Sequence, residues 1–253
     1  MPSADDYLAH DLAAGAGRRL LDLRAQGGNP DELRKAGDRL SHEFLAAELG
    51  QRRPADAILS EEGRDDAARL SADRVWIVDP LDGTREFGDA GRTDWAVHVA
   101  LWERGALTAG AVALPVQGRV LSTAEPATGS APATTAHPLR IVVSRTRPPG
   151  FVQRLAESSS TTLVPLGSAG AKTAAVITGD ADVYLHSGGQ FEWDSAAPVA
   201  VARVAGLHAS RLDGSPLEYN RPDPSLPDIL VCPTMLADGL LEAIQAAQGS
   251  GTE

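Results

Sequence analysis

Apolar residues recur every three to four positions over the first fifty residues, a spacing that predicts two amphipathic helices. The first covers residues 6–25 and places on one face Leu8, Leu12, Ala16, Leu20 and Leu23. The second extends from about residue 31 to residue 49, and its packing stripe is Leu33, Ala36, Gly37, Leu40, Phe44 and Ala47. At about 100° per residue, Asp38 points roughly 140° away from that stripe, which is typical of an ordinary solvated charge.

Shorter apolar runs then predict strands. They cover residues 57–59, the run that begins at Trp76, residues 94–102, and a hairpin formed by residues 107–114 and 119–121. In the third run, His98 lies on the face opposite Trp95, Val97, Val99 and Leu101. A lone histidine in that position is more often structural than a ligand, so we do not include His98 in the predicted site.

The second half alternates between strand and helix patterns. Strands are predicted at 139–143, 162–166, 181–186 and 207–210, and helices at 148–157, from the 167–172 turn to 177, and from Trp193 to 206, with a loop at 187–192. Residues 122–138 are rich in Ala, Thr, Pro and Ser and predict a flexible connection between domains 1–130 and 138–253, or a loose β-excursion within one domain. The fold class is α/β, with an α+β first half and a parallel or mixed sheet in the second.

Composition narrows the classes of function. The chain has 253 residues, 43% hydrophobic and 23% charged, as expected of a globular protein with a sizeable core. We expect no membrane partner and a cytoplasmic location, because the acidic N-terminus does not resemble a signal peptide and no run of 18 apolar residues occurs. The single Cys232 excludes an internal disulfide and is expected to be a buried strand thiol.

The net charge of −11, without a basic cluster, argues against nucleic acid as a partner. A phosphate-bearing substrate would also be repelled, so a metal ion is the simplest means of holding it.

The segment from Trp76 to Phe87 carries the strongest chemical signal. An apolar strand ends at Asp79, because Pro80 lacks an N–H and is expected to end the strand ladder. Asp82 follows close enough for both carboxylates to reach one centre, and Gly83-Thr84 can begin a helix whose N–H groups attract an anion. On its own, this pattern is also that of an ordinary Asp-Gly turn.

Three other parts of the chain strengthen this chemical signal. Glu61 and Glu62 follow the strand 57–59, and neighbouring strand ends can converge. The small residues from Gly167 to Lys172 form a turn into a helix, where backbone could approach a ligand. Asp194 lies at a helix start, where an N-cap role would by itself be the better interpretation.

Taken together, Glu61, Asp79-Pro80-Leu81-Asp82-Gly83-Thr84 and Trp193-Asp194-Ser195-Ala196-Ala197 resemble the inositol monophosphatase superfamily, from Asp38 to about Tyr219. The resemblance is to the CysQ-type branch of 3'-phosphoadenosine 5'-phosphate phosphatases, especially its actinobacterial members. It implies a layered αβαβα sandwich and a magnesium-dependent, lithium-sensitive phosphomonoesterase that forms a homodimer.

The resemblance also implies roles for individual residues. The metal ligands would be Glu61, Asp79, Asp82, Asp194 and the Leu81 carbonyl, and these residues, Asp79 excepted, would also contact the substrate. Gly83 and Thr84 would bind phosphate through their N–H groups, and Ser168 and Lys172 would contact the rest of the substrate. Thr84 and Asp38, with Glu61, would form the catalytic group that orients and deprotonates the attacking water, and Glu62 would lie behind the ligands.

The chemistry of these residues is consistent with that assignment. A pair of like charges 4 Å apart costs about 4 kcal/mol at an effective dielectric near 20, so converging carboxylates need a cation. Magnesium fits an all-oxygen ligand set, and the absence of His and Cys from the set argues against zinc. Two or three ions per site would support in-line attack of water on phosphorus without a phosphoenzyme.

The expected reaction is removal of the 3'-phosphate of 3'-phosphoadenosine 5'-phosphate to give AMP, in the context of sulfate assimilation. Inositol-specific members have an acid about seven residues before the Trp-Asp aspartate, where this chain has Ser187. Lys172, Arg145 and Arg85 are candidates for binding the second phosphate. The alternatives are a broad inositol 1-phosphate and fructose 1,6-bisphosphate phosphatase, and an inactive metal- and anion-binding protein.

Overall fold

The computed structural model of the protein describes residues 1–127, 138–153 and 161–249. Two long helices begin the chain: α1 (Ala4–Ala25) and α2 (Pro30–Arg52). The Ser3 side chain accepts hydrogen bonds from the N–H groups of Asp5 and Asp6, and Asn29 caps α2 in the same way ahead of Pro30 at its first turn. Both predicted helices are therefore confirmed, each a few residues longer than expected.

The predicted packing stripe of α2 is only partly correct, because Gly37 is buried and Leu33 and Phe44 pack on the core as partly buried residues, whereas the fully buried side of the helix is rotated from it. The buried residues of this helix are Gly37, Ser41, Leu45 and Leu49, whereas Ala47 is exposed. This stripe steps by four residues, and at about 100° per residue its centre lies only about 40° from Asp38. Asp38 consequently faces the protein and is half-buried, rather than pointing into solvent.

The first sheet has five strands in the order β1-β2-β3-β4-β5. They are β1 (Ala57–Ser60), β2 (Arg74–Asp82), β3 (Ala96–Glu103), β4 (Ala106–Leu114) and β5 (Arg119–Ser122). Only the β1–β2 pair is parallel. One face of the sheet packs on α1 and α2 through Trp76, Val78, Val97 and Val99, and the alternate residues face the centre of the molecule.

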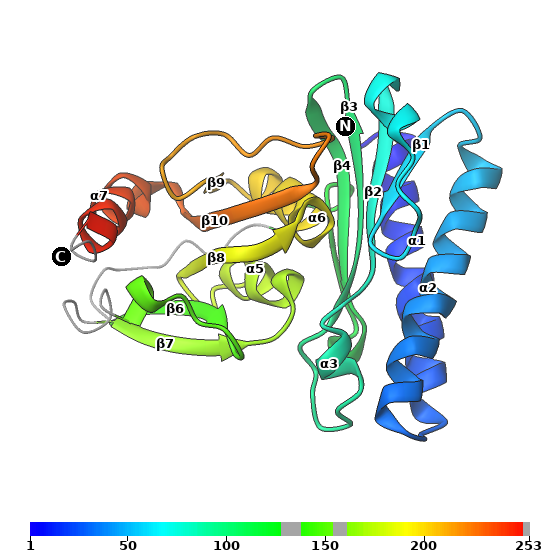
Figure 1. Ribbon diagram of the computed structural model, residues 1–253, viewed down its shortest axis with the longest axis horizontal. Helices are drawn as coiled ribbons and strands as arrows, with labels where there is room; N and C mark the ends of the chain where they lie inside the picture. The colour runs from blue at the N-terminus through cyan, green and yellow to red at the C-terminus, as the bar shows by residue number, and fades with distance from the viewer. Residues whose placement is uncertain (128–137, 154–160, 250–253) are drawn as a thin grey trace.

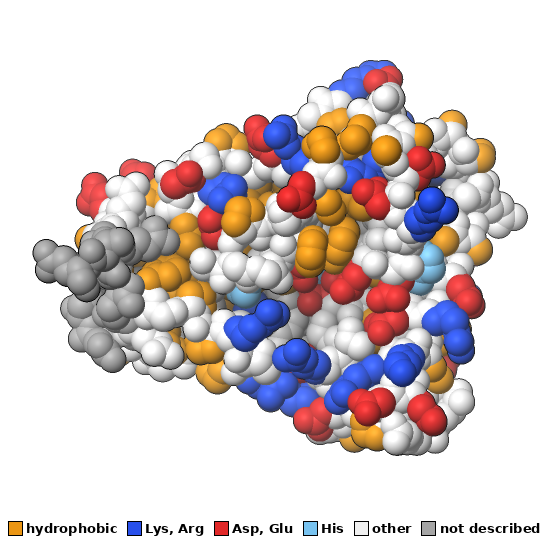
Figure 2. All heavy atoms as spheres, viewed as in Figure 1, with side chains coloured by type: hydrophobic (Ala, Val, Ile, Leu, Met, Phe, Trp, Pro, Cys, Tyr) orange, Lys and Arg blue, Asp and Glu red, His pale blue; other side chains and the backbone are white. Residues whose placement is uncertain are grey.

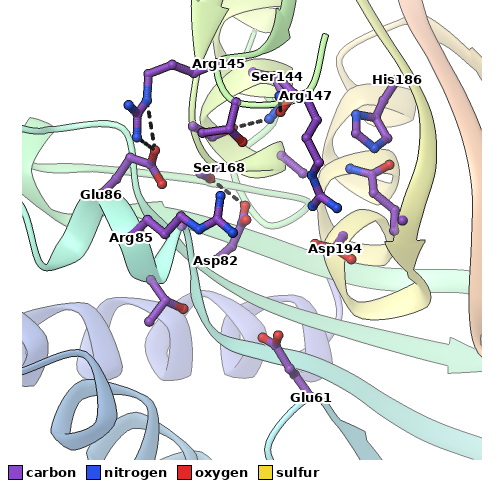
Figure 3. A pocket seen from close by; sticks show the side chains of 18 residues that line it. Glu61, Asp82, Arg85, Glu86, Ser144, Arg145, Arg147, Ser168, His186 and Asp194 are labelled. Atoms are coloured by element: carbon purple, nitrogen blue, oxygen red, sulfur yellow. Dashed lines mark hydrogen bonds and ion pairs between the residues drawn. The ribbon is translucent and has the colours of Figure 1, made fainter. Parts of the chain in front are cut away.

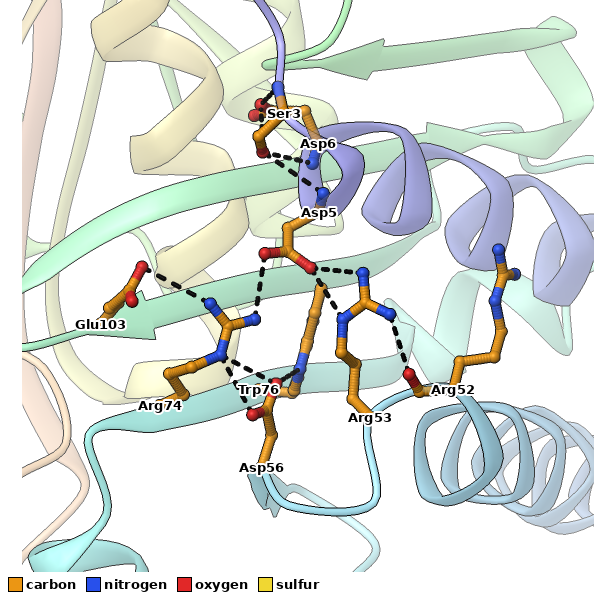
Figure 4. Close-up of polar contacts among 9 residues, drawn as sticks. All are labelled: Ser3, Asp5, Asp6, Arg52, Arg53, Asp56, Arg74, Trp76 and Glu103. Atoms are coloured by element: carbon orange, nitrogen blue, oxygen red, sulfur yellow. Dashed lines mark hydrogen bonds and ion pairs between the residues drawn. The ribbon is translucent and has the colours of Figure 1, made fainter.

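An ion-pair network joins α1, the turn before β1, and strands β2 and β3 (Figure 4). Arg74 contacts Asp5 at 3.0 Å, Asp56 at 3.0 Å and Glu103 at 3.5 Å. Asp56 also accepts a hydrogen bond from the indole Nε1 of the buried Trp76 at 2.9 Å. The network therefore ties the start of β2 to its neighbours, at the end of the strand remote from Asp79.

The second sheet is mixed and has the order β7-β6-β8-β10-β9. Its strands are β6 (Leu139–Ser144), β7 (Thr161–Leu166), β8 (Val183–Phe191), β9 (Leu207–Ser210) and β10 (Ser225–Pro233). The predicted loop at 187–192 is wrong, because β8 continues to Phe191 through a glycine pair and pairs with β10. Cys232 is buried in β10, as predicted.

The remaining helices are α3 (Thr84–Phe87), α5 (Ala169–Ile177), α6 (Glu192–Val204) and α7 (Ala237–Gly249), and short 3-10 turns cover Ala67–Ser71, Pro115–Gln117 and Thr234–Leu236. The predicted helix at 148–157 is described only to residue 153, where residues 150–153 are helical. Among the described helices, none has both the length and the apolar character needed to cross a bilayer.

Five layers follow one another along the molecule: α1 with α2, the first sheet, α5 with α6, the second sheet, and α7 (Figure 1). The middle helices share one core with both sheets. Gly110 of β4 allows α6 to approach closely, since a Cβ there would lie 2.6 Å from that of Ala200. The predicted αβαβα sandwich is confirmed, whereas the division at 130–138 lies mostly outside the described residues and stays a prediction.

Candidate active site

A bulge in β2 brings the two aspartates of the central segment together. Asp79 pairs with His98 and Asp82 pairs with Ala96, so β2 has one extra residue between them. In a regular strand, side chains three residues apart point to opposite faces, and the bulge cancels that alternation. Pro80 therefore does not end the strand, as the sequence suggested, but lies inside the bulge. Asp79 and Asp82 both face α6 and the centre of the molecule.

Asp194 completes an acidic cluster from the far half of the chain. Oxygen atoms of Asp79, Asp82 and Asp194 lie within 4.8 Å of one another. Asp194 occupies the first turn of α6, where its Oδ2 accepts a hydrogen bond from Phe191 N at 2.7 Å. Asp194 is therefore not the N-cap considered for it, because the N-cap is Phe191 and Asp194 is the third residue of the helix. Its contact with Phe191 N nevertheless fixes the carboxylate at the helix start, where it joins the cluster.

Glu61 reaches the same place from β1. Because β1 and β2 are parallel, their carboxyl ends meet at one edge, and Glu61 N donates to Val78 O at 3.4 Å. Much of the Glu61 side chain is solvent-accessible, yet protein atoms crowd its carboxylate. This desolvation, together with the charge of Asp194, raises the pKa of Glu61 to about 7 against an opposing hydrogen bond with Asp79. Glu62 is exposed beside it.

The acids of the cluster have shifted pKa values. Burial and the charges of Glu61 and Asp82 raise the pKa of Asp79 well above its ordinary value. Burial and the charge of Asp82 raise the pKa of Asp194 to about 6. Since each acid disfavours ionisation of the others, the cluster has the electrostatic signature of a site that a divalent cation would stabilise.

Asp82 differs from its neighbours because His98 and Lys172 offset its burial, and its pKa is held below the ordinary value. His98 is fully buried, with Nε2 3.1 Å from Oδ2 of Asp82 and Nδ1 3.1 Å from the carbonyl of Trp193. Burial would lower the pKa of His98, but the charge of Asp82 outweighs it and raises the pKa, so Asp82 favours the protonated ring. His98 was not among the residues predicted for the site.

A signal for His98 was present in the sequence. Its face of the strand otherwise carries the small residues Ala96 and Ala100, which permit another element to pack closely. That element is α6, which carries Asp194. A polar residue on such a face, in the strand next to Asp79, is a candidate for positioning a ligand.

The turn from Gly167 to Lys172 is held against Asp82. Oδ2 of Asp82 accepts hydrogen bonds from the Ser168 hydroxyl at 2.5 Å and from Gly170 N at 2.8 Å, and Ser168 also caps α5. Gly83 has φ +87°, a conformation that favours glycine, and a Cβ there would also crowd that of Ser168 at 3.2 Å. The turn predicted to approach a ligand thus first positions a carboxylate.

Thr84 and Asp38 meet across the site. Thr84 Oγ1 lies 3.3 Å from Oδ1 of Asp38 and 3.0 Å from the Leu81 carbonyl, and it can donate its proton to either oxygen. Burial and the nearby Glu62 raise the pKa of Asp38 to about 6, against the hydrogen bond from Thr84. A carboxylate with that pKa is a suitable proton acceptor near neutral pH.

A cavity of about 280 Å³ opens onto this cluster between the two sheets, visible as a hollow in Figure 2. The charged residues that line it are Glu61, Asp82, Arg85, Glu86, Arg145, Arg147, Lys172 and Asp194. Gly83, Thr84 and Ser168 also contribute to its wall. Of the predicted substrate cations, Arg145 is paired with Glu86 at 2.5 Å, and Lys172 is buried with its ammonium donating to the Gly167 carbonyl.

The donor set fits a hard divalent cation. Asp79, Asp82 and Asp194 offer only carboxylate oxygens, and Glu61 is hydrogen-bonded to Asp79. The Leu81 carbonyl, in the same turn, accepts from Thr84 at 3.0 Å. Arg145 pairs with Glu86 rather than with any of these acids, and His98 and Lys172 are the cationic side chains that lower the pKa of Asp82. The site can therefore hold a cation at one end of a cavity large enough for a small ester.

Comparison with known proteins agrees with this architecture. The model of the inositol monophosphatase family matches residues 7–248. The 3'-phosphoadenosine 5'-phosphate phosphatase of Mycobacterium leprae is 51% identical over 253 residues, covering 95% of this chain and 93% of that protein. The protein of the same name from Mycobacterium tuberculosis is 54% identical over 240 residues, covering 92% and 90%.

Among solved structures, CysQ from Bacteroides thetaiotaomicron superposes with a TM-score of 0.78 at 28% identity, covering 91% of this chain and 97% of that one. The chain therefore belongs to the inositol monophosphatase family. Within it, the resemblance to CysQ-type proteins predicted from the motifs is confirmed.

Proposed function

We propose that this protein is a Mg²⁺-dependent phosphomonoesterase that hydrolyses the 3'-phosphate of 3'-phosphoadenosine 5'-phosphate to give AMP and phosphate. The observation that carries the proposal is the convergence of Asp79, Asp82 and Asp194, from both halves of the chain, within 4.8 Å at the end of a cavity. The names of the mycobacterial relatives, at 51–54% identity, support this substrate.

Glu61, Asp79, Asp82, Asp194 and the Leu81 carbonyl would hold two or three Mg²⁺ ions. When bound, the ions would neutralise phosphoryl oxygens and make water a better nucleophile. His98, Ser168 and Gly170 keep Asp82 ionised and oriented for that purpose. The N–H groups of Gly83 and Thr84, at the cavity wall, would bind the phosphoryl group that is transferred.

Thr84 and Asp38 would accept the proton of the attacking water. In this step the water's proton passes to Oγ1 of Thr84, while that hydroxyl gives its own proton to Oδ1 of Asp38. The 3.3 Å contact and the raised pKa of Asp38 make both transfers feasible. The leaving oxygen departs on the opposite side of phosphorus, and no phosphoenzyme is formed.

The test is phosphate release, with Mg²⁺ and with Mg²⁺ plus Li⁺, from 3'-phosphoadenosine 5'-phosphate, 3'-AMP, inositol 1-phosphate and fructose 1,6-bisphosphate. The nucleotide bisphosphate should show the highest kcat/KM, and Li⁺ should inhibit. A higher kcat/KM for inositol 1-phosphate would instead support the broad sugar and inositol phosphatase.

The inactive-protein alternative predicts Mg²⁺ binding without turnover of any ester. Retention of Asp38 and Thr84 in contact argues against it, because a binding protein has no need of a proton acceptor. The homodimer is part of the proposal and rests on the family resemblance alone. The cytoplasmic location is also part of the proposal and stays a prediction from the sequence.

A further inference from the structure

The cavity is acidic at one end and basic along one side. Its acidic end is the cluster around Asp82 and Asp194, and its basic side carries arginines from α3 and from the segment that follows β6 (Figure 3). In a chain of net charge −11, positive charge gathered along one side of a cavity needs a reason. Metal ions at the acidic end would bind one phosphate of the substrate. They do not explain why arginines line the other side of the cavity.

The basic residues are not equivalent. Arg145 is neutralised by Glu86, and the ammonium of Lys172 is buried against the Gly167 carbonyl. Arg85 and Arg147 form no ion pair with any residue that the structure describes. Of these two, Arg85 lies on α3, directly after the 79–84 segment, whereas Arg147 extends into the cavity from the opposite wall (Figure 3).

The surroundings of Arg147 place its guanidinium. Its segment is anchored where Arg147 N donates to Ser144 Oγ at 3.2 Å and Arg145 N donates to Leu166 O at 3.0 Å. The side chain lies against Gly189, where a Cβ would be 3.3 Å from Nη1. Gly188 and Gly189 have φ +80° and +70°, a turn that glycines adopt readily and that leaves room for the guanidinium.

His186, on the same wall, has an unused acceptor. The ring is 5% exposed, and its Nε2 is 2.7 Å from the Gly188 carbonyl, so Nε2 carries the proton. Nδ1 is then an acceptor, and it has no hydrogen-bond partner among the described residues. A buried acceptor in a cavity wall is satisfied by a ligand that brings an O–H or N–H group. The wall beside Arg147 therefore suits a polar ligand as well as an anion.

We propose that Arg147 binds the phosphate that is not hydrolysed, and so determines a preference for bisphosphate over monophosphate esters. This inference rests on the proposed function. A guanidinium can donate two parallel hydrogen bonds to a phosphate, and it does not lose its charge near neutral pH. Arg147 touches the substrate away from the reacting atoms and is a specificity-determining residue, not a proton donor or acceptor.

The experiment compares kcat/KM for 3'-phosphoadenosine 5'-phosphate with kcat/KM for 3'-AMP, which lacks only the second phosphate. Wild-type enzyme should prefer the bisphosphate, and Arg147→Gln should lower the ratio of the two values by roughly tenfold or more, as for the loss of a charge-assisted contact. Arg147→Lys should give an intermediate ratio. Arg119→Gln, which removes one exposed positive charge from β5, should keep the wild-type ratio.

Failure of this inference is separable from failure of the proposed function. A wild-type enzyme that hydrolyses neither adenosine ester contradicts the function. If both esters are hydrolysed but Arg147→Gln keeps the wild-type ratio, or lowers kcat/KM for both esters equally, Arg147 does not read the second phosphate.

Discussion

Asp79 and Asp82 are both buried and only three residues apart, yet their pKa values shift in opposite directions. Asp79 has only acids as charged neighbours, whereas Asp82 has His98 at 3.1 Å and two hydrogen-bond donors, from Ser168 and Gly170. Asp82 is thus ionised before any cation binds. The pKa values of Asp79 and Glu61 are raised, and a cation bound at the cluster would favour their ionised forms. Two aspartates of one turn therefore differ in their tendency to ionise because of residues distant in sequence.

Asp38 is the residue whose ionisation should limit activity in acid. It must be ionised to accept a proton, so kcat/KM under saturating Mg²⁺ should fall as pH decreases through about 6. Asp38→Asn should lower kcat by roughly 10²- to 10⁴-fold, the usual contribution of a general base, and remove this acid limb. The measurement is the pH dependence of phosphate release between pH 5 and 8.5.

A control tests the cause of that pKa. Glu62 is the charge that helps burial raise the pKa of Asp38, so Glu62→Gln should move the acid limb to lower pH. A limb that does not move, or an Asp38→Asn enzyme with the wild-type rate, would assign the proton to another group.

Residues of the site were predictable from the sequence where the chemistry is local. Glu61, Asp79, Asp82 and Asp194 each follow a strand or begin a helix, and motifs of this kind identify them as candidates. His98 and Arg147 were not identified, because their roles depend on which element packs against them. Periodicity places a residue on a face of its own element, but it does not say what lies opposite that face.

At the scale of elements, the same limit explains the rotation of α2. Its helical pattern and the inward position of Gly37 were correct, but Leu33, Leu40 and Phe44 are only partly buried, while Ser41 packs inward against the 79–84 segment. The Ser41 hydroxyl donates to the Pro80 carbonyl at 2.6 Å, a contact that hydrophobicity alone does not reveal. Strands were predicted where β1 to β9 lie, with errors at the β2 bulge and at the end of β8, where Pro and Gly suggested a break that pairing partners prevent. β10 was expected only as the strand around Cys232, and α7 was not predicted.

Gly37 sets the distance between α2 and α3. A Cβ at this position would lie 2.7 Å from the Phe87 ring and 3.0 Å from Cδ2 of Leu81. Gly37→Ala should therefore displace α2, cost about 1–3 kcal/mol of unfolding free energy, and lower kcat by moving Asp38 away from Thr84. Urea denaturation and steady-state kinetics measure the two effects.

The same helix offers a matched control. Gly50 is exposed near the end of α2, and a Cβ added there would have nothing within 4 Å, so Gly50→Ala should be neutral or stabilise by up to about 1 kcal/mol. If the two alanine variants were equally stable and equally active, close approach at Gly37 would not position Asp38.

At the scale of the whole molecule, the acidic cluster links folding, pH and cation binding. The pKa values of Glu61, about 7, and Asp194, about 6, lie above their ordinary values of 4.5 and 3.8. Without a cation, the folded state binds more protons than the unfolded state over this range, so these groups favour folding less as pH rises from about 4 to 7. A bound cation removes the repulsion and reverses that trend.

Thermal unfolding should therefore respond to Mg²⁺ more strongly at pH 8 than at pH 5.5. A ligand at 100 times its Kd adds about 2.7 kcal/mol, which for a chain of this size raises Tm by roughly 5–10 °C. At pH 5.5, protons on Glu61 and Asp194 compete with the cation, and the shift should shrink. The readout is Tm with Mg²⁺ minus Tm with a chelator at each pH, and it requires no activity.

Two variants make this test specific to the cluster. Asp82→Asn removes the carboxylate that is ionised in advance, so the Mg²⁺-dependent rise in Tm should be lost although the protein stays folded. Asp73 is an exposed acid just before β2, paired with Arg104 at 2.9 Å at the end of the strand remote from Asp79, so Asp73→Asn should retain the full rise. The proposal would be contradicted by an equal rise in Tm at both pH values, or by a full rise in Asp82→Asn. Either result would place the stabilising cation elsewhere, and the acids that converge from the two halves of the chain would not have their proposed role.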